Sequence, residues 1–290
     1  MGRLSFLQKT AGRVLAQPDV RYCLVDYSCP DRCGSWLERT FEQEIRERRA
    51  VVERVTGQRL FNKSRSHNAG AWRALREGAE YLCFLDADTI VNDGFLACVR
   101  ERVSPRRFLI AGRADDGSDV RSLTGLLAVH GHAFRGVGGF DESFRGWGAE
   151  DIELRLRLYL IGGLDHGDVP LSLVRPIVHD DGLRTQFYEN RNLMVSNHDN
   201  MRRIQHKLAT EWRDRCVRSI ATAGRLWFNG GGAGPTWARE AAAAPPPPRA
   251  AAPVLPERPR PPQTVALHLN RSLASRRPVL SMSSRFGHRG

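Results

Sequence analysis

The stretch that decides the fold is Tyr81 to Val91, which reads YLCFLDADTIV. An apolar run of this kind is typical of a buried strand, and here it ends in an Asp-x-Asp sequence at Asp86 and Asp88. Two carboxylates spaced in this way lie on the same side of an extended backbone, where their oxygens can bind a divalent cation. Two solvated turn residues would look the same locally, so this stretch alone leaves both interpretations open.

Similar apolar runs recur along the chain and alternate with segments of helical spacing. The strand-like runs are residues 21–26, 80–85, 108–112, 124–129 and 169–178. Helical spacing is found in residues 4–15 and in a charged segment that places Leu37, Phe41, Ile45 and Val52 on one face. Residues 64–76 are typical of a loop that enters a helix, and residues 92–94 of a turn into a helix that contains Phe95, Cys98 and Val99. This alternation predicts an α/β sandwich with a mainly parallel central sheet. Ligands gather at the carboxyl ends of such strands, and the polar residues that follow apolar runs here are Asp26, Asp86, Asp88 and His179.

A second acidic motif lies in residues 138–157, GGFDESFRGWGAEDIELRLR. Glu150 and Asp151 follow a Gly-Trp-Gly turn, and the first turn of a helix stabilises negative charge. A carboxylate there could remove a proton from a substrate, or it could simply cap the helix. The leucines that follow alternate as in a strand, but leucine and arginine favour helix, so we predict a helix. Trp147 offers an apolar plate for a sugar ring, or else it is a core residue.

The overall composition limits the classes of partner. The chain has 290 residues, 41% of them hydrophobic, with a formal net charge of +12 and a sequence pI of about 10.2. Almost all of the basic residues are arginines spread along the chain, which predicts general affinity for polyanions and no specific nucleic-acid binding. The six cysteines do not form the two pairs of a common zinc site. No apolar stretch reaches the roughly 20 residues that cross a bilayer, so we expect a cytoplasmic protein, or one bound peripherally to the cytoplasmic membrane face.

The composition changes near residue 230, where AAAAPPPPRAAAPVLPERPRPPQ (241–263) follows a glycine-rich run. Such a segment cannot bury enough apolar area to offset its ordering entropy. We therefore predict a domain over residues 1–229 and a disordered tail over residues 230–290. A proline-rich docking segment is the alternative for the tail.

Four motifs occur in a recognisable order: VDYSCPD (25–31), SRSHNAGA (64–71), FLDADTIV (84–91) and the 138–157 stretch. Over roughly residues 1–200 the chain resembles the GT-A glycosyltransferases. The similarity is to the large family-2 group, with the galactosyltransferase-type C-terminal motif of β-1,4-galactosyltransferases and chondroitin-polymerase-like enzymes. It implies a GT-A fold, a UDP-sugar donor, Mn²⁺ (or Mg²⁺) and an inverting transfer to a hydroxyl of a glycan or other acceptor.

The resemblance also implies roles for individual residues. Asp26 matches an aspartate that contacts the nucleobase, and the other donor-binding positions are Arg65, Asn68, Gly70 and Asp86, with His67 beside them. Asp88 and His179 match metal ligands. Trp147 and Glu150 match acceptor-binding residues, and Asp151 with Glu150 forms the catalytic pair, in which Asp151 is the general base.

Two departures and three alternatives accompany this assignment. Family-2 chains place a nucleobase-binding strand before the first helix, whereas this sequence goes from Met1 into that helix, so we expect the edge of the donor pocket to be missing. Tyr27 also replaces a frequent second acidic residue. One alternative is therefore a degenerate, non-catalytic GT-A domain that binds a nucleotide sugar or a glycan. A glycoside hydrolase needs carboxylates on opposite sides of a bond, and adjacent Glu150 and Asp151 should diverge. A nucleotidyltransferase would need a basic glycine-rich loop near the N-terminus, and we find none.

Overall fold

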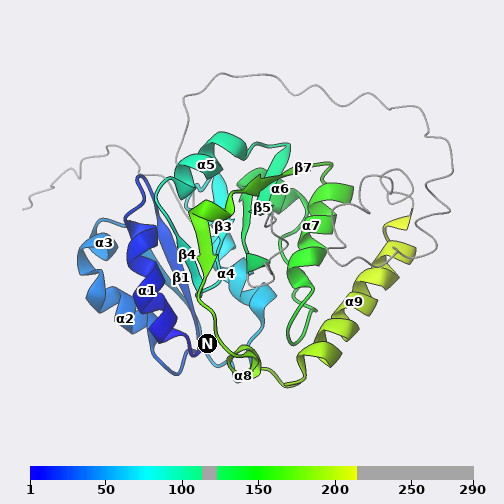
Figure 1. The fold of residues 1–290 in the computed structure, drawn as a ribbon, viewed down its shortest axis with the longest axis horizontal. Helices are drawn as coiled ribbons and strands as arrows, with labels where there is room; N and C mark the ends of the chain where they lie inside the picture. Colours follow the sequence, from blue (N-terminus) through cyan, green and yellow to red (C-terminus); the bar gives the residue numbers. More distant parts are fainter. Residues whose placement is uncertain (113–122, 214–290) are drawn as a thin grey trace, which may run out of the picture.

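The computed structural model describes residues 1–112 and 123–213, which form an α/β fold (Figure 1). Its helices are α1 (Leu4–Leu15), α2 (Cys33–Thr40), α3 (Glu42–Arg46), α4 (Lys63–Arg76), α5 (Phe95–Arg102), α6 (Gly131–Gly136), α7 (Glu150–Leu160), α8 (Asp181–Thr185) and α9 (Leu193–Ala209). Its strands are β1 (Tyr22–Tyr27), β2 (Ala50–Val55), β3 (Tyr81–Phe84), β4 (Thr89–Val91), β5 (Arg107–Ala111), β6 (Leu127–His130), β7 (Asp165–Val169) and β8 (Val174–Pro176). The α/β class is as predicted, and the prediction for residues 230–290 lies outside the described residues.

The strand pairing is mixed, which corrects the expectation of a mainly parallel sheet. Strands β1 and β2 pair in parallel, and so do β5 and β7. Strand β6 lies between β3 and β5 and runs antiparallel to both, and β4 pairs antiparallel with β8. Alternation of strands and helices predicts crossover connections, but it does not reveal that a later strand returns between two earlier ones in the opposite direction.

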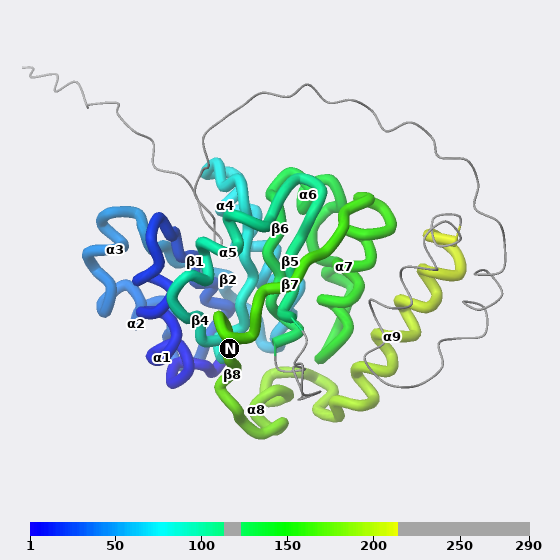
Figure 2. Tube along the Cα trace, turned by 45° about the horizontal axis from the view of Figure 1, so that its top comes forward, coloured from blue at the N-terminus to red at the C-terminus, as the bar shows by residue number. Residues whose placement is uncertain are grey.

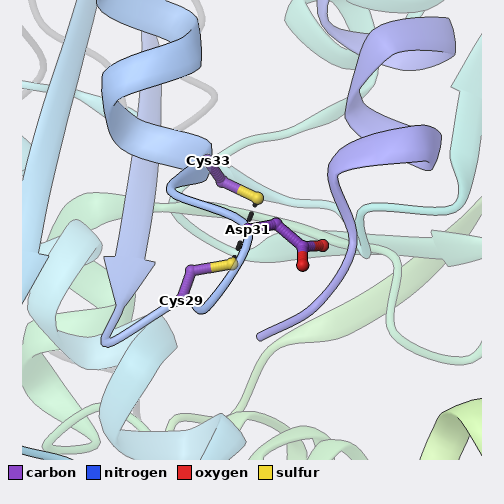
Figure 3. Close-up of side chains that lie close together, drawn as sticks. All are labelled: Cys29, Asp31 and Cys33. Atoms are coloured by element: carbon purple, nitrogen blue, oxygen red, sulfur yellow. Dashed lines mark hydrogen bonds between the residues drawn. The ribbon is translucent and has the colours of Figure 1, made fainter.

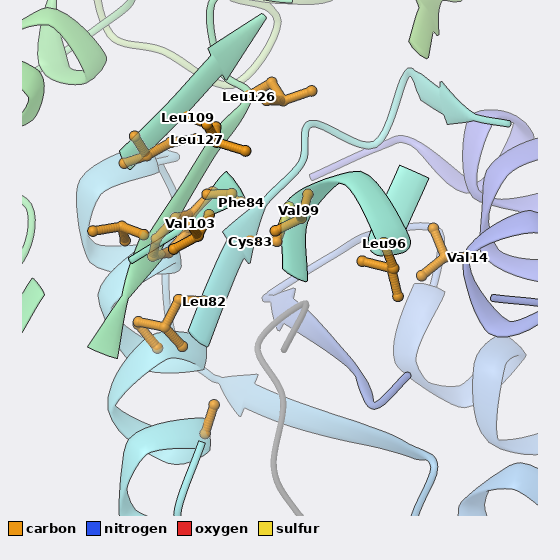
Figure 4. Packing of buried hydrophobic residues seen from close by; sticks show 14 of the residues in the cluster. Val14, Leu82, Cys83, Phe84, Leu96, Val99, Val103, Leu109, Leu126 and Leu127 are labelled. Atoms are coloured by element: carbon orange, nitrogen blue, oxygen red, sulfur yellow. The ribbon is translucent and has the colours of Figure 1, made fainter. Parts of the chain in front are cut away.

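Strand β3 lies in the main core and leads directly to the Asp-x-Asp sequence. Leu82, Cys83 and Phe84 are fully buried, together with Leu109 of β5 and Leu127 of β6 (Figure 4). A strand that is buried on both faces reads as a continuous apolar run, which explains why the sequence predicted it. The packing therefore holds the end of β3 rigidly where the first acidic motif begins.

Two sequence expectations about element boundaries were wrong. The charged segment after Ser35 is not one helical face, because its end forms strand β2 and Val52 pairs with Leu24 of β1. The predicted strand over residues 169–178 is interrupted by a short 3₁₀ turn, Leu171–Leu173, which separates β7 from β8. β-branched and apolar residues occur in both regions, so periodicity alone did not locate the breaks.

Helices cover both ends of the molecule, with α4, α5, α6 and α8 between them (Figure 1). Helices α1, α2 and α3 lie at one end, beside β1, and α7 and α9 lie at the other (Figures 1 and 2). Phe144, Leu156, Ile204 and Trp212 form a second, smaller apolar cluster that packs α9 against α7 and the loop before it. Among the described helices, none has the length and apolar character needed to span a bilayer.

Candidate functional site

The first acidic motif forms a tight turn at the end of β3. The Thr89 N–H donates to the Asp86 carbonyl at 3.0 Å, which closes the turn that contains both aspartates. The Thr10 hydroxyl of α1 donates to the Ala87 carbonyl at 3.2 Å. Helix α1 therefore braces the turn from outside the sheet.

Asp88 and His179 meet although they are far apart in sequence. Asp88 Oδ2 lies 2.7 Å from His179 Nε2, and the Ile177 N–H donates to the Asp88 carbonyl at 2.7 Å. The pairing of β4 with β8 brings these segments together, and the Phe6 ring stacks on the imidazole with centroids 5.2 Å apart. Burial, together with the charge of Asp86, raises the pKa of the Asp88 carboxyl, against the opposing effect of His179.

Lys63, the first residue of α4, joins the two acidic motifs. Its Nζ lies 3.2 Å from Asp86 Oδ1, 3.3 Å from Glu150 Oε1 and 3.0 Å from Asp151 Oδ2. Burial alone would lower the pKa of Lys63, but the three carboxylates raise it well above its ordinary value. Burial would raise the pKa of Asp86, yet the Lys63 ammonium brings it below its usual range. Adjacent Glu150 and Asp151 were expected to diverge, but both reach this one ammonium group.

Glu150 responds differently from Asp86 to the same neighbour. Burial and then the adjacent Asp151 raise the pKa of Glu150 to about 7, although Lys63 opposes the shift. The side chain is 8% exposed. Near neutral pH this carboxyl therefore exists in both protonation states, so it can either donate or accept a hydrogen bond.

The Gly-Trp-Gly turn is held by helix α9. Ser196 Oγ accepts from the Trp147 N–H at 2.8 Å, and the Asn200 amide donates to the Gly148 carbonyl at 2.8 Å. Gly146 and Gly148 both have positive φ, and a Cβ on Gly146 would lie 2.1 Å from Ser196 Oγ. These positions require glycine because the backbone is left-handed and α9 approaches closely.

A cavity of about 240 Å³ connects the Asp-x-Asp turn with the aromatic side chain of this loop. Its lining includes Asp86, Asp88, His179, Lys63, His67 and Trp147. Two guanidinium groups also line it, from Arg3 and from Arg184, and the Arg184 group lies 6.0 Å from the Trp147 ring centroid. An acidic turn facing two guanidinium groups suits a ligand that is both anionic and metal-bound.

The predicted donor-binding residues occupy different environments. Asp26 accepts from the Cys29 and Gly34 N–H groups, each at 2.9 Å, and does not line the cavity. Asn68 is buried in α4, where its amide binds the Phe140 carbonyl and Glu142, each at 2.9 Å, and so holds the 139–142 loop. Arg65 is exposed and Gly70 is buried within α4. The ligand-binding roles of these four residues stay predictions.

Three residues near the acids were not predicted from the sequence. Lys63 is one of only three lysines in a chain rich in arginine, and that rarity was the available signal. Buried Arg155 of α7 donates to the Thr124 and Leu126 carbonyls. Gly125 packs so closely that a Cβ there would lie 2.0 Å from Asp86 Oδ2, and nothing in its local sequence indicates this contact.

The donors at the Asp-x-Asp turn fit a divalent cation. Within the described part of the chain, Asp88 Oδ1 is buried and has no hydrogen-bond partner, while Oδ2 contacts His179. A buried carboxylate oxygen without a partner is costly unless it has a ligand. Carboxylate oxygens with one imidazole nitrogen suit manganese better than magnesium.

Part of this chain is similar in sequence to known galactosyltransferases. A family model described as the N-terminal domain of galactosyltransferase matches residues 118–171. β-1,4-Galactosyltransferase 2 of Cricetulus griseus is 31% identical over 134 residues, which are 43% of this chain and 35% of that protein. Human β-1,4-galactosyltransferase 4 is 27% identical over 168 residues, which are 56% of this chain and 45% of that protein. The chain thus spans less than half the length of these relatives.

Solved structures of glycosyltransferases also match in part. GalNAc-T7, solved with UDP, GalNAc and Mn²⁺, is 16% identical with a TM-score of 0.48, and the match covers 81% of this chain and 51% of that one. Drosophila β-1,4-galactosyltransferase 7, solved with xylobiose, is 21% identical with a TM-score of 0.34, covering 51% of this chain and 64% of that one. The sequence matches show that part of this chain, including residues 118–171, is similar to galactosyltransferases.

Proposed function

We propose that this chain is a metal-dependent, inverting glycosyltransferase. It moves a hexose or N-acetylhexosamine from a UDP-sugar to an acceptor hydroxyl, in the synthesis of a polysaccharide or glycoconjugate. The support comes from the galactosyltransferase relatives and from the two acidic motifs that Lys63 brings together.

One observation carries the proposal. Asp88 and Asp151 each have one oxygen engaged, by His179 and by Lys63, and one buried oxygen that has no partner within residues 1–112 and 123–213. Leaving a buried acceptor unpaired costs about 1–3 kcal/mol. Two such atoms lie at the positions where the family motifs predict a metal ligand and a base, and bound ligands would satisfy both. Asp88 lines the cavity directly, whereas Glu150 and Asp151 do not line it and are linked to it by Lys63, which does.

The site residues divide into a donor side and an acceptor side. Asp88 and His179 would hold the cation, whose charge would stabilise the departing diphosphate. Arg3 and Arg184 line the same cavity and bind the anionic part of the donor. The aromatic face of Trp147 orients the acceptor sugar.

The proton moves on the acceptor side. Asp151 Oδ1 accepts the proton of the acceptor hydroxyl. The hydroxyl oxygen bonds to the anomeric carbon of the donor sugar as the bond from that carbon to UDP breaks. Lys63 holds the other oxygen, Oδ2, at 3.0 Å and so fixes the direction in which Oδ1 points. Glu150, whose pKa is about 7, exchanges hydrogen bonds with the acceptor hydroxyls.

The test separates donor binding from turnover. Purified chain is titrated with UDP-galactose, UDP-N-acetylgalactosamine and UDP-glucose, with and without Mn²⁺, and acceptor products are read by mass spectrometry. Asp88→Ala should abolish Mn²⁺-dependent donor binding, whereas Asp93→Ala, an exposed aspartate nearby, should not. Asp151→Asn should keep donor binding and lose turnover by about two orders of magnitude or more.

Each outcome decides between functions. Mn²⁺-dependent binding without transfer to any acceptor in the panel would favour the non-catalytic, nucleotide-sugar-binding alternative. Donor binding that is unchanged in Asp88→Ala would show that Asp88 does not bind a metal needed for donor binding. Full turnover in Asp151→Asn would show that Asp151 is not the general base.

A further inference from the structure

A second set of ligand-type side chains lies on the loop between β1 and α2. Cys29, Asp31 and Cys33 place two sulfur atoms and one carboxylate oxygen within 4.8 Å of one another (Figure 3). The two Sγ atoms are 3.2 Å apart. We propose that Cys29, Asp31 and Cys33 bind a thiophilic divalent cation, with zinc as the ion that best fits these donors.

The separation of the two sulfur atoms is close to that of a metal site. Two thiolates bound tetrahedrally to zinc at about 2.3 Å are about 3.8 Å apart. The observed 3.2 Å therefore requires a movement of roughly half an ångström, whereas a disulfide at about 2.05 Å requires an approach of more than about 1 Å. Asp31 is exposed, so its side chain can rotate to complete the set.

The loop is held in place before any ion binds. Both oxygens of Asp26 accept backbone N–H groups at the two ends of the loop, from Cys29 and from Gly34. Cys33 is 3% exposed and is the first residue of helix α2. A preformed loop lowers the entropic cost of gathering ligands, which is the main obstacle to a metal site with only three protein donors.

Backbone donors also favour negative charge at this place. The Gly2 N–H donates to Cys29 Sγ at 3.2 Å, and the Leu4 N–H, at the start of α1, donates to Asp31 Oδ2 at 3.2 Å. Together with the start of α2 at Cys33, two helix N-termini thus lie at the cluster, and helix N-termini stabilise thiolates and carboxylates. Thiolates are the form that binds metal.

This cluster differs in chemistry from the Asp-x-Asp turn. Cys29, Cys33 and Asp88 line the same cavity, but sulfur ligands select zinc-like ions, whereas carboxylates and imidazole suit manganese. With three protein ligands the zinc would keep an open fourth position, as zinc sites with a reactive or exchangeable ligand do. The chain therefore carries two metal sites of different selectivity that contribute residues to the same cavity.

The experiment uses the full chain, reduced and freed of metal. Titration with Cd²⁺ should produce thiolate-to-cadmium charge-transfer absorption that saturates at one equivalent. Cys29→Ser and Cys33→Ser should each lose that absorption, while Cys98→Ser, a partly exposed thiol on α5, should keep it. Asp88→Ala should keep it as well, because the two sites are separate.

A variant at an exposed position guards against misfolding. Asp31→Asn should retain the cadmium absorption and lower zinc affinity by about tenfold or more, measured by competition with a chromogenic chelator. No charge-transfer absorption, or the same absorption in Cys29→Ser and Cys33→Ser as in Cys98→Ser, would overturn the proposal. So would a disulfide between Cys29 and Cys33 that persists in the reduced sample, detected by peptide mapping.

Discussion

Replacing Lys63 by Met removes the positive charge that, among the described residues, contacts Asp86, Glu150 and Asp151 together. The Lys63 side chain is 15% exposed, and its ammonium lies 3.0–3.3 Å from Asp86, Glu150 and Asp151. At an effective dielectric constant of about 20, each contact represents about 5 kcal/mol of gross Coulomb attraction, most of which offsets desolvation. Methionine has a similar length and keeps the apolar packing of the stem, so the change isolates the charge.

The free energy of unfolding that Lys63→Met loses relative to the wild type should be large near neutral pH and smaller in acid. Removing one partner of a buried ion pair destabilises by about 3–5 kcal/mol, because the other charge stays buried. Lys63 lowers the pKa of Asp86 and opposes the rise in the pKa of Glu150, so both pKa values rise in its absence, and protonation then relieves the repulsion between the carboxylates as the pH falls. Between about pH 7 and about pH 5 the folded variant takes up more protons than the folded wild type does, so the stability deficit of the variant shrinks as the pH falls.

Urea unfolding followed by tryptophan fluorescence, in buffer with a metal chelator, measures the stability loss at about pH 7 and at about pH 5. Lys9→Met is the matched control, because Lys9 is exposed on α1 and its replacement should change stability by about 0.5 kcal/mol or less. A loss below about 1 kcal/mol for Lys63→Met, or an equal loss at both pH values, would refute the view that Lys63 neutralises the acids.

Three further predictions concern neighbouring residues. Because the pKa of Glu150 in the folded chain is raised from 4.5 to about 7, the wild type should lose up to about 3 kcal/mol of stability as the pH rises through that window. Urea midpoints of Glu150→Gln should lack this slope, and a slope unchanged from the wild type would contradict the assigned burial. Gly125→Ala should displace the Asp86 carboxylate and weaken Mn²⁺ binding by calorimetry about tenfold or more, whereas Gly136→Ala, with open space around its added Cβ, should bind normally. Asn68→Ala leaves the buried Phe140 N–H without its acceptor and should cost about 1–3 kcal/mol in chemical unfolding; a cost near zero would show that the loop does not need this amide.

The elements around the site followed from the sequence where burial produces a clear pattern. Strand β3 and helix α1 have the predicted positions, because an apolar run or helical spacing records directly which faces are buried. The loop expected at the start of residues 64–76 is wrong, because helix α4 already begins at Lys63. The preference of leucine and arginine for helix decided the ambiguous stretch after Asp151 correctly, since α7 spans Glu150–Leu160. The predicted proximity of Asp88 and His179 is also present.

Long-range pairing could not be inferred in the same way. The position of β6 between β3 and β5 depends on backbone hydrogen bonds, which leave no trace in side-chain periodicity. The contact of Gly125 with Asp86 is equally invisible, because a glycine carries no side chain to record its neighbour.

Lysine is rare in this sequence, and two of its three positions lie among acids. Lys63 contacts three carboxylates, and Lys207 of α9 contacts both Asp141 and Glu153. A compact ammonium with three rotatable donors can contact several acids from one point, whereas a planar guanidinium binds one carboxylate in a fixed fork. Two of the three lysines of this arginine-rich chain, Lys63 and Lys207, thus lie where several acids converge, whereas Lys9 is exposed on α1.

Helix α1 contacts the proposed cation site twice, through the Thr10 hydroxyl on the Ala87 carbonyl of the Asp-x-Asp turn and through the Phe6 ring on the His179 imidazole. A ligand that restricts the motion of Asp88 and His179 should also restrict the motion of helix α1, because α1 contacts both segments. Amide hydrogen exchange along residues 4–15 should therefore slow when the cation binds, even though none of those backbone groups touches it. Amide exchange of this helix would therefore report whether the proposed cation site is occupied, without a labelled substrate or an engineered probe.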